Sequence, residues 1–253
     1  MLILRNIVFA VAFYLNCAFW FVLALFGYLL PREKFWWFSN GWAASSMALF
    51  KTLIGAKIEI RGLDTLPDGG CIIAAKHQSA FETIRLLTDL PLPTYIYKRE
   101  LSRVPLFGWH LKRLGQIAVD RGGGAEAMAD LAARTRAALA EGRQIIIFPE
   151  GTRRAVGAEP DYKLGVAQLY RTLGVPCVPV ALNSGLAWPR RRFLKQPYRV
   201  VMEFLEPIPA GMPAKTAFRL MQERIEEASN RLVAEALAEK GQTLADIQSS
   251  KES

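Results

Sequence analysis

The chain has 253 residues, 51% of them hydrophobic, and its 32 lysines and arginines against 23 acidic residues give a net charge of +9. This length suffices for a buried core, and the apolar content excludes an intrinsically disordered chain. The positive mean hydropathy of +0.14 stands beside a pI near 9.6. A chain that is both basic and apolar points to a membrane surface at least as strongly as to nucleic acid.

The first apolar stretch has the length of a membrane-spanning helix. Residues 6–30 contain no charged side chain, and a helix of that length crosses roughly 30 Å of hydrocarbon. A cleavable secretory signal would have an apolar core of about 7 to 15 residues and a small-residue cleavage site. Here the run is longer and ends in Pro31, Arg32, Glu33 and Lys34. We therefore expect a retained anchor.

A second uncharged stretch, residues 35–50, contains Trp36, Trp37, Phe38 and Trp42. As a helix it would reach only about 24 Å, which is short for a span, and tryptophan favours the headgroup level. We expect two membrane-anchoring helices within residues 1–55, joined at Pro31, with the second in the interface or re-entering the leaflet. The alternative is one spanning helix followed by a buried helix of the soluble domain.

From residue 56 onward, short apolar runs of strand type alternate with longer helical ones. Strands are expected at residues 57–60, 71–75, 94–97, 116–119, 144–148, 177–181 and 198–205. Helices are expected at residues 80–88, 104–114, 125–140, 163–173 and 215–240. Several strands are almost continuously apolar, which suits a sheet covered on both faces. The pattern predicts an α/β domain over residues 56–253, with a mixed, largely parallel sheet flanked by helices.

The three cysteines, Cys17, Cys71 and Cys177, are odd in number and far apart. This spacing excludes a disulfide framework and a Cys-x-x-Cys metal or redox site. Each cysteine lies in an apolar run, which indicates buried thiols in a reducing compartment.

His77 directly follows the expected strand at residues 71–75 and precedes a helix. Open α/β sheets place their chemistry at the carboxyl ends of strands. Glu82 comes five residues later, and on one continuous helix the two side chains would diverge by about 140°. They meet only if His77 lies on the loop and Glu82 in the first helical turn. A carboxylate bound to one imidazole nitrogen would then leave the other nitrogen as a general base.

Both residues also have a structural interpretation. Residues 79–82 read Ser-x-x-Glu, a capping box that would make Glu82 a helix cap. His77 would then be a hydrogen-bonded structural histidine. The second histidine, His110, lies in a segment typical of a helix surface or interface, and we expect no catalytic role for it.

Two further segments carry positive charge. Residues 148–154, Phe-Pro-Glu-Gly-Thr-Arg-Arg, follow a strand; Gly151 allows close backbone approach to a ligand, and Arg153 and Arg154 supply forked donors that suit a phosphate. Residues 98–121 carry six basic side chains against two acidic ones. Either segment taken alone would also fit a charged surface.

These segments resemble the motifs of the glycerolipid acyltransferase family. The first motif, a histidine followed after four intervening residues by an acid, matches His77 and Glu82, although the usual acid is aspartate. The second motif matches Lys98, Glu100, Leu101, Pro105, Gly108, Gly115, Val119, Asp120 and Arg121. The third, Phe-Pro-Glu-Gly-Thr-Arg, is complete at residues 148–153, and the fourth, Val-Pro-Val, lies at residues 178–180. Four motifs in this order, within residues 71–181, are a specific signal.

The resemblance implies a glycerolphosphate-acyltransferase-like fold that moves a fatty acyl group from acyl-CoA or acyl carrier protein to the sn-2 hydroxyl of lysophosphatidic acid, giving phosphatidic acid. It implies His77 as the base, Glu82 as its orienting acid, and neither a metal nor another cofactor. The substrate phosphate site implied in this way consists of Arg153, Gly151, Glu150, Thr152, Lys98 and Arg121, with Glu150 ordering the loop or contacting glycerol rather than phosphate. The resemblance also implies a bacterial inner membrane, with the catalytic domain on the cytoplasmic side.

Other function classes fit less well. A membrane-anchored thioesterase or phospholipase would run the same base on water, and a related acyltransferase would acylate another lyso-lipid such as lyso-ornithine lipid. Nucleic acid is disfavoured as a partner because the basic residues interleave with apolar membrane-type segments and no nucleic-acid motif occurs. The sequence contains no Gly-x-Ser-x-Gly elbow, no dinucleotide or P-loop motif and no metal-ligand cluster.

The positive charge is concentrated in one part of the sequence. Residues 162–202 contain no acid, and within them Arg190, Arg191, Arg192, Lys195 and Arg199 form a cluster. We interpret this cluster as part of a cationic face around the site and the bilayer, suited to phosphate-bearing lipids and an acidic or phosphorylated acyl donor.

Overall fold

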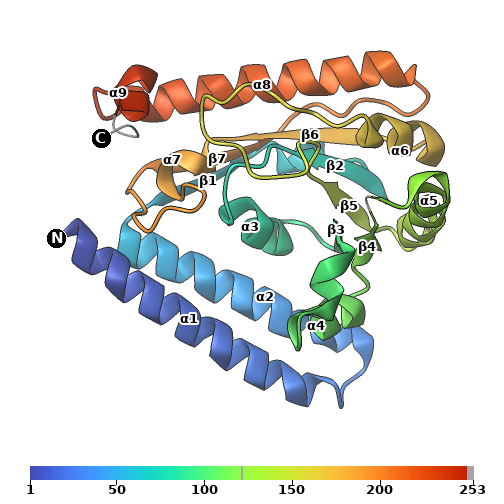
Figure 1. Ribbon diagram of the computed structural model, residues 1–253, viewed down its shortest axis with the longest axis horizontal. Helices are drawn as coiled ribbons and strands as arrows, with labels where there is room; N and C mark the ends of the chain where they lie inside the picture. The colour runs from blue at the N-terminus through green and yellow to red at the C-terminus, as the bar shows by residue number, and fades with distance from the viewer. Residues whose placement is uncertain (121, 250–253) are drawn as a thin grey trace.

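A seven-stranded sheet forms the centre of the protein in the computed structural model, which describes residues 1–120 and 122–249 (Figure 1). The strands are β1 (Lys57–Arg61), β2 (Cys71–Ala75), β3 (Pro93–Lys98), β4 (Ile117–Val119), β5 (Gln144–Ile147), β6 (Cys177–Leu182) and β7 (Arg199–Phe204). Their order across the sheet is β1-β7-β6-β2-β5-β3-β4. Strands β6, β2, β5, β3 and β4 are parallel to one another. Strand β7 pairs antiparallel with β6, and β1 pairs parallel with β7. The prediction of a mixed, largely parallel sheet is confirmed.

The central strand β2 is buried along its whole length. Cys71, Ile73 and Ala75 pack on one face of the sheet, and Ile72 and Ala74 on the other. This alternation follows from the two-residue period of a strand. Both faces of the sheet are therefore covered, as the continuous apolar runs indicated.

Helices form a layer on each face of the sheet (Figure 1). Helices α5 (Gly124–Ala140), α6 (Gly165–Leu173) and α8 (Ala214–Ala238) cover the face of Ile72 and Ala74. Helices α2 (Arg32–Leu49) and α3 (Phe81–Asp89) cover the opposite face. The shorter elements are η1 (Phe50–Ile54), η2 (Leu63–Thr65), η3 (Arg99–Arg103), α4 (Phe107–Arg113), α7 (Ser184–Ala187) and α9 (Leu244–Ser249).

One expected helix is shorter than predicted. The helix expected over residues 104–114 begins three residues late: α4 spans Phe107–Arg113, and residues 99–103 form the separate short helix η3. Pro105 cannot donate a backbone hydrogen bond, and Leu106 adopts a φ of 62°, outside the helical region. The chain therefore breaks between the two short helices.

The N-terminal helix α1 (Leu2–Gly27) is long and apolar enough to cross a membrane, and only 11% of its most apolar window is buried. Its exposed hydrophobic side chains include Ile3, Leu4, Ile7, Val11, Leu15 and Phe19. The chain then reverses at Pro31, and α2 runs back along α1 (Figure 1). The helix length and exposure suit contact with lipid.

Polar contacts hold α1 against α2. Asn16 Nδ2 donates to Ser46 Oγ at 3.0 Å, and Trp20 Nε1 donates to Ser45 Oγ at 2.9 Å. Gly41 leaves room for the Trp20 ring, since a Cβ atom there would lie 2.1 Å from it. Interhelical hydrogen bonds beside a small residue allow close packing in an apolar environment.

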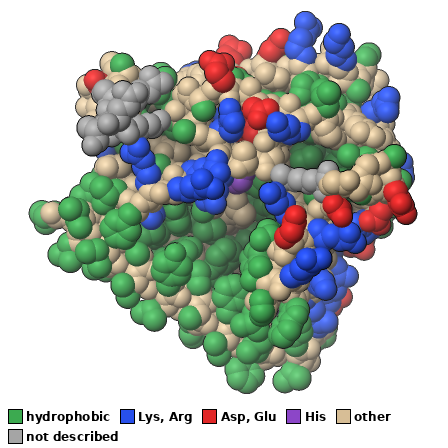
Figure 2. All heavy atoms as spheres, viewed as in Figure 1, with side chains coloured by type: hydrophobic (Ala, Val, Ile, Leu, Met, Phe, Trp, Pro, Cys, Tyr) green, Lys and Arg blue, Asp and Glu red, His purple; other side chains and the backbone are tan. Residues whose placement is uncertain are grey.

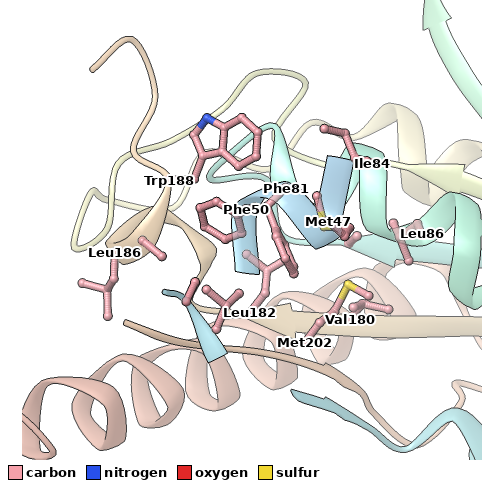
Figure 3. Packing of buried hydrophobic residues seen from close by; sticks show 14 of the residues in the cluster. Met47, Phe50, Phe81, Ile84, Leu86, Val180, Leu182, Leu186, Trp188 and Met202 are labelled. Atoms are coloured by element: carbon pink, nitrogen blue, oxygen red, sulfur yellow. The ribbon is translucent and has the colours of Figure 1, made fainter. Parts of the chain in front are cut away.

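Helix α2 and the following turn also belong to the main hydrophobic core. Met47 and Phe50 pack with Phe81 of α3, and the Trp188 ring lies 5.0 Å from the Phe50 ring (Figure 3). Phe9 of α1 joins the same cluster, with its ring 5.3 Å from that of Trp188. Helices α1 and α2, which together form the N-terminal hairpin, are thus packed against the α/β part of the chain through buried aromatic side chains.

Candidate active site

His77 lies in the loop between β2 and α3, and Glu82 lies in the first turn of α3. Their side chains meet, with His77 Nδ1 2.9 Å from Glu82 Oε1. The loop-and-first-turn arrangement is the one that the five-residue spacing requires. An ionised carboxylate only accepts hydrogen bonds, so Nδ1 carries the proton and Nε2 has a free lone pair.

Glu82 is completely buried and its carboxylate collects several donors. Besides His77, Oε1 accepts the backbone N–H groups of Gln78 at 2.8 Å and Ser79 at 2.7 Å. Oε2 accepts the hydroxyl of Ser184 at 2.7 Å. The bond from Ser79 is one arm of a capping box, so Glu82 caps the start of α3 and binds His77 at the same time. These contacts leave the carboxylate little freedom to rotate.

The loop of residues 148–154 packs directly on His77. The Phe148 ring stacks on the imidazole at a centroid distance of 3.9 Å and an interplanar angle of 17°. The backbone N–H of Arg154 donates to the carbonyl oxygen of His77 at 2.7 Å. This loop and the histidine, 71 or more positions apart in the chain, therefore form one structural unit.

A buried ion cluster lies behind His77. Lys76 Nζ is 2.9 Å from Glu150 Oε1 and 2.5 Å from Glu226 Oε1 of α8, and Tyr162 donates its hydroxyl to the same Glu226 oxygen at 2.7 Å. The other Glu150 oxygen accepts the backbone N–H of His77 at 3.1 Å. Burial raises the pKa of Glu150, and the neighbouring Lys76 acts in the opposite direction. The cluster connects α8, the 148–154 loop and the backbone of His77.

This cluster bears on the role expected for Glu150. The third motif includes Glu150 in the substrate phosphate site, with ordering of the loop or contact with glycerol as its expected role. Its side chain is fully buried, and its carboxylate is held by Lys76 and by the backbone of His77. A carboxylate would also repel a phosphate. The arrangement fits ordering of the loop. Sequence reasoning did not single out Lys76 or Glu226; a lysine directly after a buried strand was the available signal for Lys76.

A cavity of about 1200 Å³ begins at His77 and extends between the helices. Its polar end is lined by His77, residues 148–153, Lys98 and Lys163. Its apolar part is lined by Phe13, Trp20, Phe21, Phe35, Phe38, Trp42, Ile84, Leu87, Phe107, Leu111 and Leu114. Figure 2 shows the hollow where the hydrophobic surface over α1 and α2 meets a band of lysine and arginine side chains. The cavity therefore offers both an apolar and a cationic environment.

The predicted phosphate ligands have different positions. Arg153, Gly151, Thr152 and Lys98 all line the polar end of the cavity. Gly151 adopts a φ of 65°, a conformation that favours glycine. Arg121, the remaining member, lies outside the described residues.

Two other basic side chains have structural contacts. Arg154 donates to the carbonyl oxygen of Glu159 at 2.8 Å and lies 3.8 Å from Asp161, so it braces the loop. His110 lies where α4 meets the N-terminal hairpin, as expected of an interface residue, with Nδ1 3.0 Å from the Tyr28 hydroxyl. It also lines the apolar part of the cavity, and burial lowers its pKa.

Comparison with known proteins places these residues in a recognised family. A family model described as acyltransferase matches residues 57–183. The 1-acyl-sn-glycerol-3-phosphate acyltransferase of Pseudomonas aeruginosa is 34% identical over 196 residues, which cover 77% of this chain and 76% of that protein. The human 1-acyl-sn-glycerol-3-phosphate acyltransferase alpha is 29% identical over 138 residues, which cover 53% of this chain and 48% of that protein.

The fold also has a solved counterpart. The crystal structure of the 1-acyl-sn-glycerophosphate acyltransferase PlsC from Thermotoga maritima superposes with a TM-score of 0.70 at 22% sequence identity. The match covers 90% of this chain and 98% of that one. The match therefore extends well beyond residues 57–183.

Proposed function

Because this chain belongs to the acyltransferase family and is an O-acyltransferase, we propose that it transfers a fatty acyl group from a thioester to the sn-2 hydroxyl of lysophosphatidic acid. The observation that carries the proposal is the position of the His77–Glu82 pair, where an apolar cavity meets a cationic loop. Lysophosphatidic acid has the same two parts, an acyl chain and a phosphate, with the reacting hydroxyl between them. The product is phosphatidic acid.

In the proposed reaction His77 Nε2 accepts the proton of the sn-2 hydroxyl as its oxygen attacks the thioester carbonyl carbon. The tetrahedral intermediate collapses with cleavage of the carbon–sulfur bond, and the leaving thiolate takes the proton from the imidazolium. The proton that His77 takes from the hydroxyl leaves with the thiol, and the proposed reaction includes no metal or other cofactor beyond the acyl donor.

Glu82 orients the base and stabilises the imidazolium that forms in the transition state. The buried contacts of Glu82 with Ser184, Gln78 and Ser79 support this role, because they hold the carboxylate in one orientation. The stacked Phe148 ring restrains the other side of the imidazole. Less reorganisation is then needed during the proton transfer.

The substrate phosphate binds at the polar end of the cavity. Arg153 offers a planar, forked set of donors, and Lys98 adds a point charge at the end of β3. Gly151 and Thr152 bring the loop backbone and a hydroxyl to the same end of the cavity. Arg121 remains part of the proposed site from the sequence motif. Glu150 acts by ordering the loop.

The apolar part of the cavity accommodates acyl chain, and residues 1–55 hold its opening at the membrane. The exposed apolar surface of α1 supports this anchoring role. We place the enzyme in a bacterial inner membrane with the catalytic part on the cytoplasmic side, where acyl-CoA and acyl carrier protein are available.

An assay of the purified full-length chain should cross lysophosphatidic acid and lyso-ornithine lipid with acyl-CoA and acyl carrier protein. We expect phosphatidic acid from lysophosphatidic acid, and no thioester hydrolysis in the absence of an acceptor. Free fatty acid without an acceptor would instead identify a hydrolase.

The same assay tests the phosphate site. Arg153→Ala should lower kcat/KM for lysophosphatidic acid at least about tenfold, as expected for loss of a charge-assisted hydrogen bond. The matched control is Lys215→Ala, which removes a cation from an exposed position of α8. Equal kinetic constants in the two variants would refute the phosphate role of Arg153.

A further inference from the structure

The loop between α7 and β7 presents an unusual surface. Residues 190–195 contain four cations, Arg190, Arg191, Arg192 and Lys195, with Phe193 and Leu194 among them. Arg191 and Arg192 are exposed, and the exposed fractions of Phe193 and Leu194 are 51% and 38%. We call these six residues the basic loop.

None of the four cations is paired with a carboxylate in the part of the chain that the structure describes. Arg190 and Lys195 instead donate to backbone carbonyl oxygens, those of Arg153 and Phe193. Some exposed arginines elsewhere in the chain do have acidic neighbours, such as Arg231 with Glu203. The basic loop therefore carries positive charge that the protein itself does not neutralise.

The basic loop is fastened to the N-terminal helix. The buried Asn6 side chain of α1 accepts the backbone N–H of Lys195 at 2.7 Å and donates to the Lys195 carbonyl oxygen at 3.1 Å. The Lys195 ammonium lies 5.8 Å from the ring centroids of both Phe9 and Trp188. The loop thus has a fixed position beside the first turns of α1, where Ile3 and Leu4 are exposed.

We propose that the basic loop is a second membrane contact that binds the anionic headgroups of phospholipids. Its arginines would meet lipid phosphates while Phe193 and Leu194 enter the apolar boundary beneath them. Each lysine or arginine at such a surface strengthens partitioning onto an anionic bilayer about fivefold. A soluble acidic protein is a less suitable partner, because the exposed Phe193 and Leu194 adjoin the lipid-facing surface of α1.

The contact also reaches the candidate active site. Arg190 Nη1 donates to the carbonyl oxygen of Arg153 at 2.5 Å. The position of the basic loop therefore restrains the backbone of Arg153, which lines the cavity. Resting on the proposed function, this link predicts higher turnover in anionic than in zwitterionic bilayers.

The test measures membrane contact without using activity. A Phe193→Cys variant in a Cys17→Ala background carries an environment-sensitive fluorophore, since the other two cysteines are buried. The full-length protein is placed in nanodiscs of phosphatidylcholine alone, or with about a third phosphatidylglycerol, and quenching by acrylamide, which is uncharged, is measured. We expect quenching at least about threefold weaker in the anionic discs, with the difference abolished by high salt.

A charge-reversal pair provides the control. Arg191→Glu with Arg192→Glu should restore the quenching seen in phosphatidylcholine, whereas Lys215→Glu with Arg219→Glu on α8 should not. Equal quenching in both kinds of disc would overturn the proposal. The proposal would also be overturned if the fluorophore in phosphatidylcholine discs were protected from quenching only when acyl carrier protein is added. Because no substrate is present, failure here is distinct from failure of the proposed reaction.

Discussion

Glu82 Oε2 accepts the hydroxyl of Ser184, a residue 102 positions further along the chain, while Oε1 of the same carboxylate binds His77. The two contacts join the β2–α3 loop to the segment that follows β6. They are possible because β2 and β6 are neighbouring parallel strands whose carboxyl ends meet at one edge of the sheet. The acid of the proposed catalytic pair is thus oriented from two separate segments of the chain.

His77→Ala should reduce kcat by about a thousandfold or more, because proton transfer by a positioned base contributes up to about four orders of magnitude. The variant should still fractionate with membranes and keep its melting temperature within a few degrees, since His77 is partly exposed. Phosphatidic acid formation in purified samples measures the effect. Turnover close to that of the parent enzyme would show that His77 is not the base.

Glu82→Gln and Ser184→Ala separate charge from orientation. Glutamine replaces one carboxylate oxygen of Glu82 with an NH2 group, which cannot accept the hydrogen bonds that converge there. It also removes the negative charge that stabilises the imidazolium, so kcat should fall about a thousandfold. Ser184→Ala leaves the three donors on Oε1 in place and should cost only about threefold to tenfold. Both variants are compared by kcat and by melting temperature. A larger effect from Ser184→Ala would contradict the assignment.

Lys76→Met should destabilise the protein by about 3–5 kcal/mol, because it leaves the buried Glu150 carboxylate without its cation. Tyr162→Phe removes one hydrogen bond to Glu226 from the same cluster and should cost about 1 kcal/mol. The free energy of unfolding is measured by denaturant titration in detergent micelles.

The double variant Lys76→Met with Glu150→Gln provides the control for this prediction. It removes both charges, so its stability should exceed that of Lys76→Met alone. A double variant that is less stable than Lys76→Met would show that the pair does not act through mutual charge compensation.

Burial raises the pKa of the Cys71 thiol to about 11 and that of Cys177 to about 12. The pKa of each thiol is thus higher in the folded protein than in the unfolded chain, where it is near 9. The contribution of the neutral, buried thiols to the free energy of unfolding is therefore complete below pH 9 and is lost as the pH rises through 11 to 12. At pH 9.5 the folded protein should therefore leave both thiols unmodified by iodoacetamide, whereas the denatured chain reacts. Peptide mapping measures the labelling. Modification of either residue in the folded state would contradict the buried position.

Phe50→Ala should lower stability by about 3–5 kcal/mol, because Phe50 is completely buried among Phe9, Phe81 and Trp188. The matched control is Phe19→Ala on α1, where the ring is 59% exposed and the cost in detergent should be below about 0.5 kcal/mol. Thermal unfolding in detergent compares the two. Equal melting temperatures would mean that the N-terminal hairpin is not part of the core.

The sequence alone determined the elements and the chemistry available to them. Alternation of apolar residues predicted the strands, the uncharged N-terminal run predicted the anchor helix, and the position of His77 after a strand predicted the edge where the site would form. These are local properties, set by backbone geometry and side-chain burial within a few residues. The later start of α4 was not predicted, because leucine seldom adopts a positive φ such as the 62° of Leu106.

The tertiary structure decided which distant side chains meet. The strand order places β2 between β5 and β6, and only that order brings Phe148 and Ser184 to His77 and Glu82. It also buries Lys76 against Glu226 of α8 and sets the basic loop beside Asn6 of α1. No local pattern encodes these contacts, since each joins segments 70 or more residues apart through the packing of the whole sheet.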